Sequence, residues 1–296
     1  MLDFRIRTFI KLCETMNFTK AGEALGLTQP AVSKQIHFLE DYYGEKLFNY
    51  KAKKLTLTKA GKILLESSYR LYNDEETLKY RIKEAEGHRK VLNFGVTRTV
   101  GDYYIAKNLA AYIRENANTE IKMIVENTEV LLEKMHKGEI SFAIVEGYYD
   151  KKVFDSILFA EVPFIAVAGK DYEFSKENPK NLVDLLGENL ILREEGSGTR
   201  AILERHLSKE NLSIKDFKSS MEIGGINAIL QMLELNLGIS FIYYPAAERE
   251  IEIGNLQEID LVDFKEKHRF SFIWTKDSIY SYEYQNICKN LQKNRL

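Results

Sequence analysis

Residues 17–39 read NFTKAGEALGLTQPAVSKQIHFL, and this stretch decides the fold of the N-terminal part of the chain. Thr19 is predicted to cap a short helix over 20–25, and Gly26 ends it because glycine readily adopts the left-handed conformation. Thr28 is predicted to cap a second helix, with Pro30 in the first turn, where a missing N–H does no harm. Two short helices joined by a tight turn predict a helix-turn-helix unit, whose second helix fits the major groove of DNA.

The second helix of this unit is expected to have one buried and one polar face. Val32, Ile36 and Leu39 recur at helical spacing and are predicted to face the core. A glutamine can pair with an adenine edge, a serine serves bases or phosphates, and a lysine supplies positive charge. The candidate DNA-binding residues on this helix are therefore Thr28, Gln29, Pro30, Ser33 and Lys34.

A basic turn follows the helices. The alternating residues 55–58 come after a cluster of lysines, and together they predict a two-stranded wing whose basic tip touches backbone phosphates. Its candidate contacts are Lys51, Lys53 and Lys54. On spacing alone, a three-helix cap with a solvated basic turn is the alternative.

Composition bounds the classes of protein that fit. At 296 residues with 45% apolar residues, the chain suits two folded domains rather than a disordered protein. Residues 1–90 hold 17 Lys and Arg against 12 Asp and Glu, whereas the remainder is acidic, which suggests an anionic partner at one end. Charges within residues 1–16 interrupt any signal-peptide core, and the most apolar stretch is too short to span a membrane, so a cytoplasmic protein is expected.

A long helix is predicted between the two domains. From Lys59 to about Gly87 there is no proline, and Leu64, Leu71, Leu78 and Ala85 repeat every seven residues. Such a repeat favours one apolar seam that pairs with a copy of itself. A solvated surface helix is the alternative.

Beyond Arg89 predicted strands alternate with predicted helices, which favours mostly parallel sheets covered by helices. The predicted strands are 91–97, 120–126, 141–145, 161–168, 189–192, 239–243 and 269–274, and the predicted helices are 103–115, 129–137, 182–185, 200–209, 226–234 and 280–293. In such sheets a ligand binds beyond the carboxyl ends of the strands, near helix N-termini.

Three loops fit that position. Two follow predicted strands, and the third is rich in glycine and hydroxyl groups at a helix start, a setting that favours anions. Their candidate effector-binding residues are Thr97, Arg98, Thr99, Thr128, Arg193, Gly196, Ser197, Gly198 and Thr199. Each hydroxyl has an alternative role as a plain helix cap, and the two glycines have one as turn residues.

Recognisable catalytic patterns are not found in the sequence. Gly196-Ser197-Gly198 lacks the spacing of a nucleophile elbow, and no Walker loop or dinucleotide fingerprint occurs. The histidines form no metal-ligand pair, and Cys13 and Cys288 show no zinc spacing. The expectation is a protein that is not an enzyme and needs no metal or cofactor.

Residues 1–61 contain many positions of one known sequence pattern. These positions are Phe9, Asn17-Phe18-Thr19, Ala21, Ala24-Leu25, Thr28-Gln29-Pro30-Ala31-Val32-Ser33, Gln35-Ile36, Leu39-Glu40, Gly44, Leu47-Phe48, Leu57-Thr58 and Ala60-Gly61. Through them the segment resembles the N-terminal domain of the LysR-type transcriptional regulators. Two positions depart from that family, since Gly22 stands where alanine is usual and Tyr50 where arginine is usual. The resemblance implies DNA binding and a dimer formed through the long helix.

Residues 91–296 resemble the effector-binding domain of the same family, a two-lobed fold akin to periplasmic binding proteins. The signature at 193–200, together with Val145-Glu146-Gly147 and residues 225–229, looks most like the branch that controls carbon dioxide fixation and sulfur assimilation. Glu195 stands where that branch usually has proline, which adds negative charge beside the expected anion site.

The resemblance thus implies an α+β multidomain chain. The expected parts are a winged helix-turn-helix over 1–60, a linker and dimerisation helix over 61–88, and an effector-binding domain over 89–296. The last has lobe I at about 91–163 and 268–296 and lobe II at about 164–267.

The expected function is transcriptional regulation under the control of a small anionic effector held between the lobes. The expected partners are double-stranded operator or promoter DNA, this effector, further copies in a homodimer or homotetramer, and RNA polymerase, with no membrane. The alternative is a small-molecule-binding protein or enzyme of the same two-lobed fold with an N-terminal helical addition.

Overall fold

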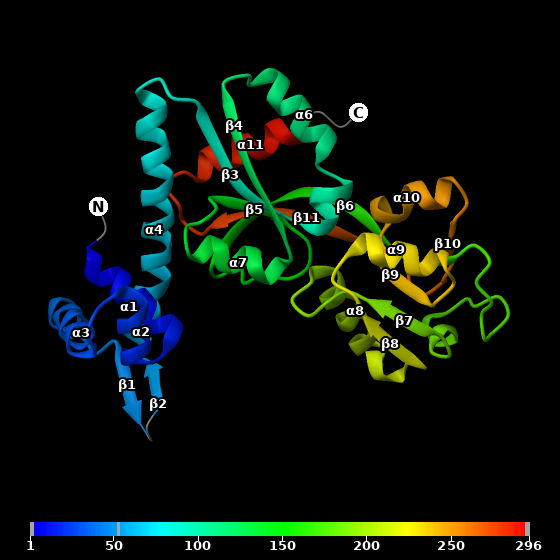
Figure 1. Ribbon diagram of the computed structural model, residues 1–296, viewed down its shortest axis with the longest axis horizontal. Helices are drawn as coiled ribbons and strands as arrows, with labels where there is room; N and C mark the ends of the chain where they lie inside the picture. The colour runs from blue at the N-terminus through cyan, green and yellow to red at the C-terminus, as the bar shows by residue number, and fades with distance from the viewer. Residues whose placement is uncertain (1–2, 52–53, 294–296) are drawn as a thin grey trace.

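The computed structural model describes residues 3–51 and 54–293 and shows a small helical domain, one long helix and a larger two-lobed domain (Figure 1). The small domain contains α1 (Phe4–Thr15), α2 (Phe18–Leu25), α3 (Gln29–Tyr43) and the antiparallel hairpin of β1 (Phe48–Lys51) and β2 (Lys54–Leu57). Phe9, Leu12 and Val32 are fully buried at its centre. The predicted helix-turn-helix and wing are both present.

The start of α2 differs from the prediction. Asn17, not Thr19, is the N-cap, because the Asn17 side chain accepts hydrogen bonds from the backbone N–H groups of Thr19 and Lys20 at 2.9 and 3.0 Å. The helix therefore begins at Phe18, whose ring lies 6.5 Å from that of Phe48. At α3 the predicted cap is confirmed, since Thr28 accepts from the N–H of Ala31 at 3.3 Å.

Helix α4 (Lys59–Ala85) is the predicted long helix, and it stands between the small domain and the rest of the chain (Figure 1). Its buried side is polar and packs on the larger domain. Asn73 donates to the carbonyl of Met135 at 2.6 Å, and the hydroxyls of Thr77 and Tyr284 share a hydrogen bond of 3.0 Å. These contacts hold α4 against the larger domain along one face.

The larger domain is built on a sheet with the strand order β4-β3-β5-β11-β6-β9-β7-β8, and β10 pairs with β6. The strands are β3 (Lys90–Thr97), β4 (Thr119–Glu126), β5 (Phe142–Val145), β6 (Phe154–Gly169), β7 (Asn189–Leu192), β8 (Ser219–Glu222), β9 (Ile239–Tyr243), β10 (Leu256–Ile259) and β11 (Glu266–Thr275). The α-helices are α5 (Arg98–Tyr103), α6 (Ala106–Glu115), α7 (Thr128–His136), α8 (Gly198–Lys209), α9 (Ile226–Glu234), α10 (Tyr244–Glu252) and α11 (Ser281–Gln292), with short 3-10 turns at Leu182–Leu185 and Ile214–Asp216.

Two long strands connect the lobes. Strand β6 pairs with β11 up to Phe164 and with β9 from Phe164 onward, so its partner changes at this buried phenylalanine. Both strands run antiparallel to their neighbours, whereas β3, β4 and β5, like β7, β8 and β9, pair in parallel. The prediction of mostly parallel sheets is therefore wrong at the centre, because these strands carry the chain from one lobe to the other and back.

The predicted helix over 103–115 is also wrong in detail. The structure has two helices there, α5 and α6, and α5 begins directly after β3. Tyr104, with ψ of −49°, caps the end of α5 and separates it from α6. As a result Thr99 lies inside α5 rather than in a loop before a helix.

Candidate functional site

Helix α3 lies at the outer edge of the small domain (Figure 1), and most of its polar side chains are exposed. Thr28, Gln29, Pro30 and Lys34 are exposed, and Ser33 is half-buried. The opposite face, with Val32, Ile36 and Leu39, is buried. Five of the predicted DNA-binding residues thus share the start of one helix, with their side chains available to a groove of DNA.

The hairpin places further lysines beside this helix domain. Lys51 and Lys54 are directly opposite each other in the register of β1 and β2, and both are exposed. Lys53 lies outside the described residues. Two cations at the end of a projecting hairpin suit contacts with phosphates rather than with base edges.

A buried carboxylate fixes the hairpin to α3. Glu40 is 6% exposed and accepts hydrogen bonds from the backbone N–H of Leu47 at 3.0 Å and from Lys46 at 2.7 Å. Burial on its own raises the pKa of Glu40, but these hydrogen bonds, led by that from Lys46, lower it overall. One ionised side chain, that of Glu40, therefore fixes the position of the hairpin relative to α3.

In the larger domain, the predicted hydroxyl groups are buried and do not act as helix caps. Thr97 and Ser197 occupy the N-cap positions of α5 and α8, yet neither side chain makes a capping hydrogen bond. At α7 the cap is Asn127, which accepts from the N–H of Val130 at 3.0 Å, and Thr128 is the next residue. The five predicted hydroxyls, at Thr97, Thr99, Thr128, Ser197 and Thr199, are each at most 4% exposed.

Glu146 brings three of these hydroxyls together. Its carboxylate oxygen Oε1 accepts from Thr99 Oγ1 at 3.1 Å and from Thr199 Oγ1 at 2.8 Å. Its backbone carbonyl accepts from Thr128 Oγ1 at 2.9 Å. Thr99 and Thr128 follow β3 and β4, whereas Thr199 follows β7 across the cleft, so the predicted loops converge on one residue of the chain itself.

The predicted arginines are already paired with carboxylates. Arg193 is buried and donates to both oxygens of Glu194, at 2.7 and 2.9 Å. Arg98 lies 3.7 Å from Glu126. The charge of Arg193 lowers the pKa of Glu146. Arg98 lies between Thr97 and Thr99 in the sequence, and its Nε is buried without a hydrogen-bond partner among the described residues.

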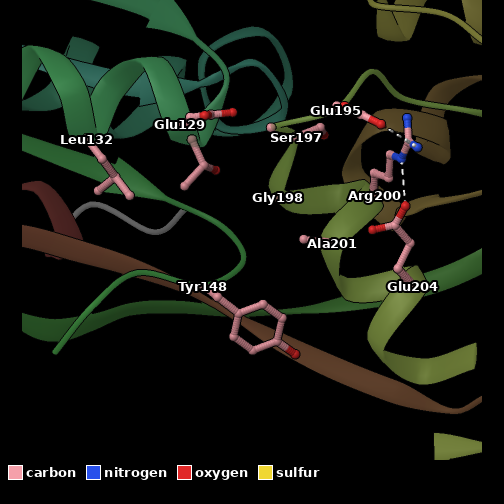
Figure 2. Close-up of a pocket in the computed structure, with 11 residues that line it drawn as sticks. Glu129, Leu132, Tyr148, Glu195, Ser197, Gly198, Arg200, Ala201 and Glu204 are labelled. Atoms are coloured by element: carbon pink, nitrogen blue, oxygen red, sulfur yellow. Dashed lines mark hydrogen bonds and ion pairs between the residues drawn. The ribbon is translucent and has the colours of Figure 1, made fainter. Parts of the chain in front are cut away.

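A cavity of about 370 Å³ opens beside the cluster, between α7 and α8 (Figure 2). Glu129 and Leu132 lie on one side, and Ser197, Arg200 and Glu204 on the other. Arg200 pairs with Glu204 at 2.8 Å and lies 3.6 Å from Glu195. The rim is acidic, and its arginine is engaged, as the dashed lines in Figure 2 show.

Glycine residues let the lobes approach closely at this cluster. A Cβ atom on Gly198 would lie 2.4 Å from the backbone carbonyl oxygen of Glu146, which is too close for any side chain. Gly196 has a φ of +80°, and Gly147 has a φ of +83°. The two glycines of the predicted anion loop therefore serve both a turn and a close contact between loops.

In the sequence, Glu146 is marked only as part of the Val145-Glu146-Gly147 signature. The signal that identifies it is its position directly after the buried strand β5, at the same sheet edge as the residues that follow β3 and β4. Applied to the third parallel strand, the same rule selects this carboxylate. Its burial results from tertiary packing, which the sequence pattern alone does not show.

Across residues 3–51 and 54–293, no group of three or more His, Cys, Asp or Glu side chains is arranged to hold a metal ion. Within the same residues, none of the helices is both long and apolar enough to cross a membrane.

Comparison with known proteins agrees with this architecture. Residues 5–62 match the family model of the bacterial regulatory helix-turn-helix protein, lysR family, and residues 85–286 match the LysR substrate binding domain. A probable RuBisCO transcriptional regulator of Phaeodactylum tricornutum is 28% identical over 98% of this chain and 95% of its own. That name agrees with the expected branch of regulators of carbon dioxide fixation.

Solved structures show the same fold. An OxyR C206 mutant of Corynebacterium glutamicum has a TM-score of 0.62 and 20% identity, covering 98% of this chain and 90% of its own. The CcmR regulatory domain of Synechocystis PCC6803, in complex with 2-PG, has a TM-score of 0.61 and 22% identity, covering 69% of this chain and 96% of its own. With both parts of the chain matched by family models, the chain belongs to the LysR family of transcriptional regulators.

Proposed function

We propose that this regulator reads operator DNA through α3 and binds a small oxyanion effector between its two lobes. The proposed DNA-binding domain is residues 1–60, with 61–88 as linker and 89–296 as effector domain. Gln29 and Ser33 make the base contacts, and Lys34, Lys51, Lys53 and Lys54 contact phosphates. As a DNA-binding regulator it acts where the chromosome is, in the cytoplasm, and its regulatory output passes to RNA polymerase.

One observation carries the effector proposal. Buried hydroxyl groups from both lobes meet at one place without capping their helices, and Thr97 Oγ1 and Ser197 Oγ have no hydrogen-bond partner among the described residues. Buried polar groups are ordinarily paired, so unpaired hydroxyls at a cleft support a ligand that accepts their hydrogen bonds. The CcmR structure supports the oxyanion class, because 2-PG, 2-phosphoglycolate, is such an anion.

The linker helix supports assembly with a second copy. Leu71, Leu78 and Ile82 on α4 are 52%, 46% and 57% exposed, and their spacing places them on one side of the helix. An apolar stripe of this kind on a long helix is the usual seam of a helical pair. We assign it to a homodimer, from which a homotetramer can be built.

A thermal-shift screen tests the effector class. 2-Phosphoglycolate, phosphate, sulfate and small carboxylates are added to the full chain, since a ligand of the folded state raises the melting temperature. We expect at least one oxyanion to raise it and to change the affinity for operator DNA. Ser197→Ala is expected to reduce the shift, whereas Ser208→Ala, an exposed serine on α8, serves as control. If none of these oxyanions raises the melting temperature, the oxyanion class is wrong.

A further inference from the structure

Glu146 lies where the two lobes meet and connects them. It follows β5 of the first lobe and is 1% exposed. Its Oε1 accepts hydrogen bonds from Thr99 of the same lobe at 3.1 Å and from Thr199 of the other lobe at 2.8 Å. The carboxylate thus occupies hydroxyl donors that sequence reasoning assigned to an anionic effector.

Further polar atoms around this carboxylate are buried and unpaired. Among the described residues, no hydrogen-bond partner is found for Glu146 Oε2, Thr97 Oγ1, Ser197 Oγ, Arg193 Nη1 or Tyr243 OH. All but the first can donate a hydrogen bond. The cluster therefore holds unused donors from both lobes next to an ionisable acceptor.

An anion that used these donors would meet the charge of Glu146. Desolvation by burial raises the pKa of Glu146 to about 7, against the hydrogen bonds from Thr199 and Thr99 and the positive charge of Arg193. The other charged group is Glu194, which pairs with Arg193 and raises the pKa of Glu146 further. From β9, Tyr243 stays neutral because its buried hydroxyl has a pKa well above 10. A protonated Glu146 is thus accessible near neutral pH.

We propose that Glu146 sets the ligand selectivity of the cleft by taking up one proton when an oxyanion binds. Without ligand, the ionised carboxylate accepts the hydrogen bonds of Thr99 and Thr199. On binding, one proton from solvent neutralises Glu146, the two hydroxyls become donors to the oxyanion, and the new carboxylic O–H donates to it as well. This inference rests on the proposed oxyanion effector.

The charge balance explains why a proton is needed. Arg193 is matched by Glu194, Arg200 at the rim by its own carboxylates, and Arg98, between Thr97 and Thr99, by Glu126 at 3.7 Å. Each of these three arginines thus already has a carboxylate to balance its charge before an anion binds. Bringing two negative charges together in a buried site is unfavourable, and protonation of one of them removes the repulsion. The effector class is therefore an oxyanion that also accepts a hydrogen bond from a carboxylic acid.

A ligand-free experiment tests the titration of Glu146 by itself. The unfolding free energies of the wild type and of Glu146→Gln are measured from pH 5 to pH 8.5. Because the folded pKa lies above the unfolded one, the wild type binds the extra proton when folded and loses stability as pH rises toward and through 7. We expect the Gln variant to lack this loss, so that the difference between the two proteins changes with pH. Parallel curves would overturn the titration of Glu146.

A calorimetric experiment tests proton uptake on binding, with 2-phosphoglycolate as the probe. Titrations at pH 8 in buffers of different ionisation heat count the protons taken up. We expect close to one more proton for the wild type than for Glu146→Gln, and wild-type affinity that falls about tenfold per pH unit above 7. The Gln variant corrects for ionisation of the probe itself. Glu139→Gln, at an exposed glutamate paired with Lys134, is the matched control and keeps wild-type behaviour.

The outcomes separate the two proposals. Equal proton counts in the wild type and the Gln variant overturn the role of Glu146 and leave the oxyanion effector standing. If neither 2-phosphoglycolate nor the other oxyanions of the thermal-shift screen bind either protein, the effector class is wrong and the proton-coupled mechanism falls with it. Tighter binding of a ligand carrying an ammonium group, lost in Glu146→Gln, would assign the carboxylate to a cation instead.

Discussion

The polar residues of α3, the proposed DNA-reading helix, and those of the cluster around Glu146 between the two lobes differ in their access to water. On α3, Gln29 and Lys34 are exposed, and among the residues that the structure describes their side chains make no hydrogen bond or ion pair. In the cluster, Thr99 and Thr199 are at most 3% exposed and hold Glu146. A change on α3 should therefore alter DNA binding alone, whereas a change in the cluster should also alter the stability of the fold.

The difference follows from the two ligands. DNA is a large, hydrated surface, so the residues that read it remain solvated until they meet it. A small molecule between two lobes is surrounded by protein, so its binding groups are buried beforehand. Thr99 and Thr199 are paired with Glu146, whereas Thr97 and Ser197 have no hydrogen-bond partner among the described residues.

The largest effect is expected at the buried ion pair of the cluster. Glu194→Ala leaves the Arg193 guanidinium, whose side chain is 2% exposed, without its two hydrogen bonds to a carboxylate. Breaking a buried pair in this way costs about 3–5 kcal/mol of unfolding free energy. Urea unfolding at neutral pH measures it.

The reverse substitution is the control. Arg193→Met keeps much of the apolar stem and leaves behind Glu194, whose side chain is 22% exposed and closer to water. Its loss of stability should be the smaller of the two. A larger loss of stability for Arg193→Met than for Glu194→Ala would contradict the prediction that the buried arginine is the costlier of the two residues to leave unpaired.

Base readout is expected to have the next largest effect. Gln29→Ala and Ser33→Ala should each lower discrimination between operator and random DNA by about 1–3 kcal/mol, the range for a lost base contact. Because Gln29 is exposed, its variant should keep the wild-type unfolding curve within about 0.5 kcal/mol. Competition binding with both DNAs measures the discrimination. Unchanged operator preference in both variants refutes the assignment of these residues.

The recognition helix and the linker were predictable because their signals are local. Thr28 as cap and the inward face of α3 follow from short-range spacing, and α4 follows from a repeat without proline or glycine breaks. Even so, Asn17 was missed as the cap of α2, since Asn and Thr are both good caps and only geometry selects between them.

The cluster was only half predictable. The loops after β3, β4 and β7 were located by the rule for strand ends, but Glu146 was not, because a lone Glu after a strand is normally solvated. The missed elements β8 and β10 have four residues each, and α10 starts at Tyr244 directly after β9, with Pro245 in its first turn. Short edge strands and an abutting helix owe their form to tertiary packing rather than to pattern.

The wing lysines should act uniformly on all DNA. Lys51→Ala combined with Lys54→Ala removes two exposed cations that face each other across the hairpin. Each lost phosphate contact reduces the slope of log affinity against log salt by about 0.9, so the pair should reduce it by roughly 2. Operator and random DNA should weaken alike. Binding isotherms at several salt concentrations measure the salt slope and the affinity for each DNA. A loss of affinity for the operator alone would indicate that the wing contacts base edges.

The smallest effect concerns an exposed residue that serves the fold. Asn17 is exposed like Gln29, but its side chain accepts two backbone hydrogen bonds at the start of α2, whereas no helix cap involves the side chain of Thr19. Asn17→Ala should therefore cost about 1 kcal/mol of unfolding free energy, and Thr19→Ala less than about 0.5 kcal/mol. Thermal or urea unfolding of the two variants decides between them. Equal losses of unfolding free energy would contradict Asn17 as the cap of α2. A larger loss for Asn17→Ala would show that hydrogen bonds, and not exposure alone, distinguish exposed residues that stabilise the domain from exposed residues that contact DNA.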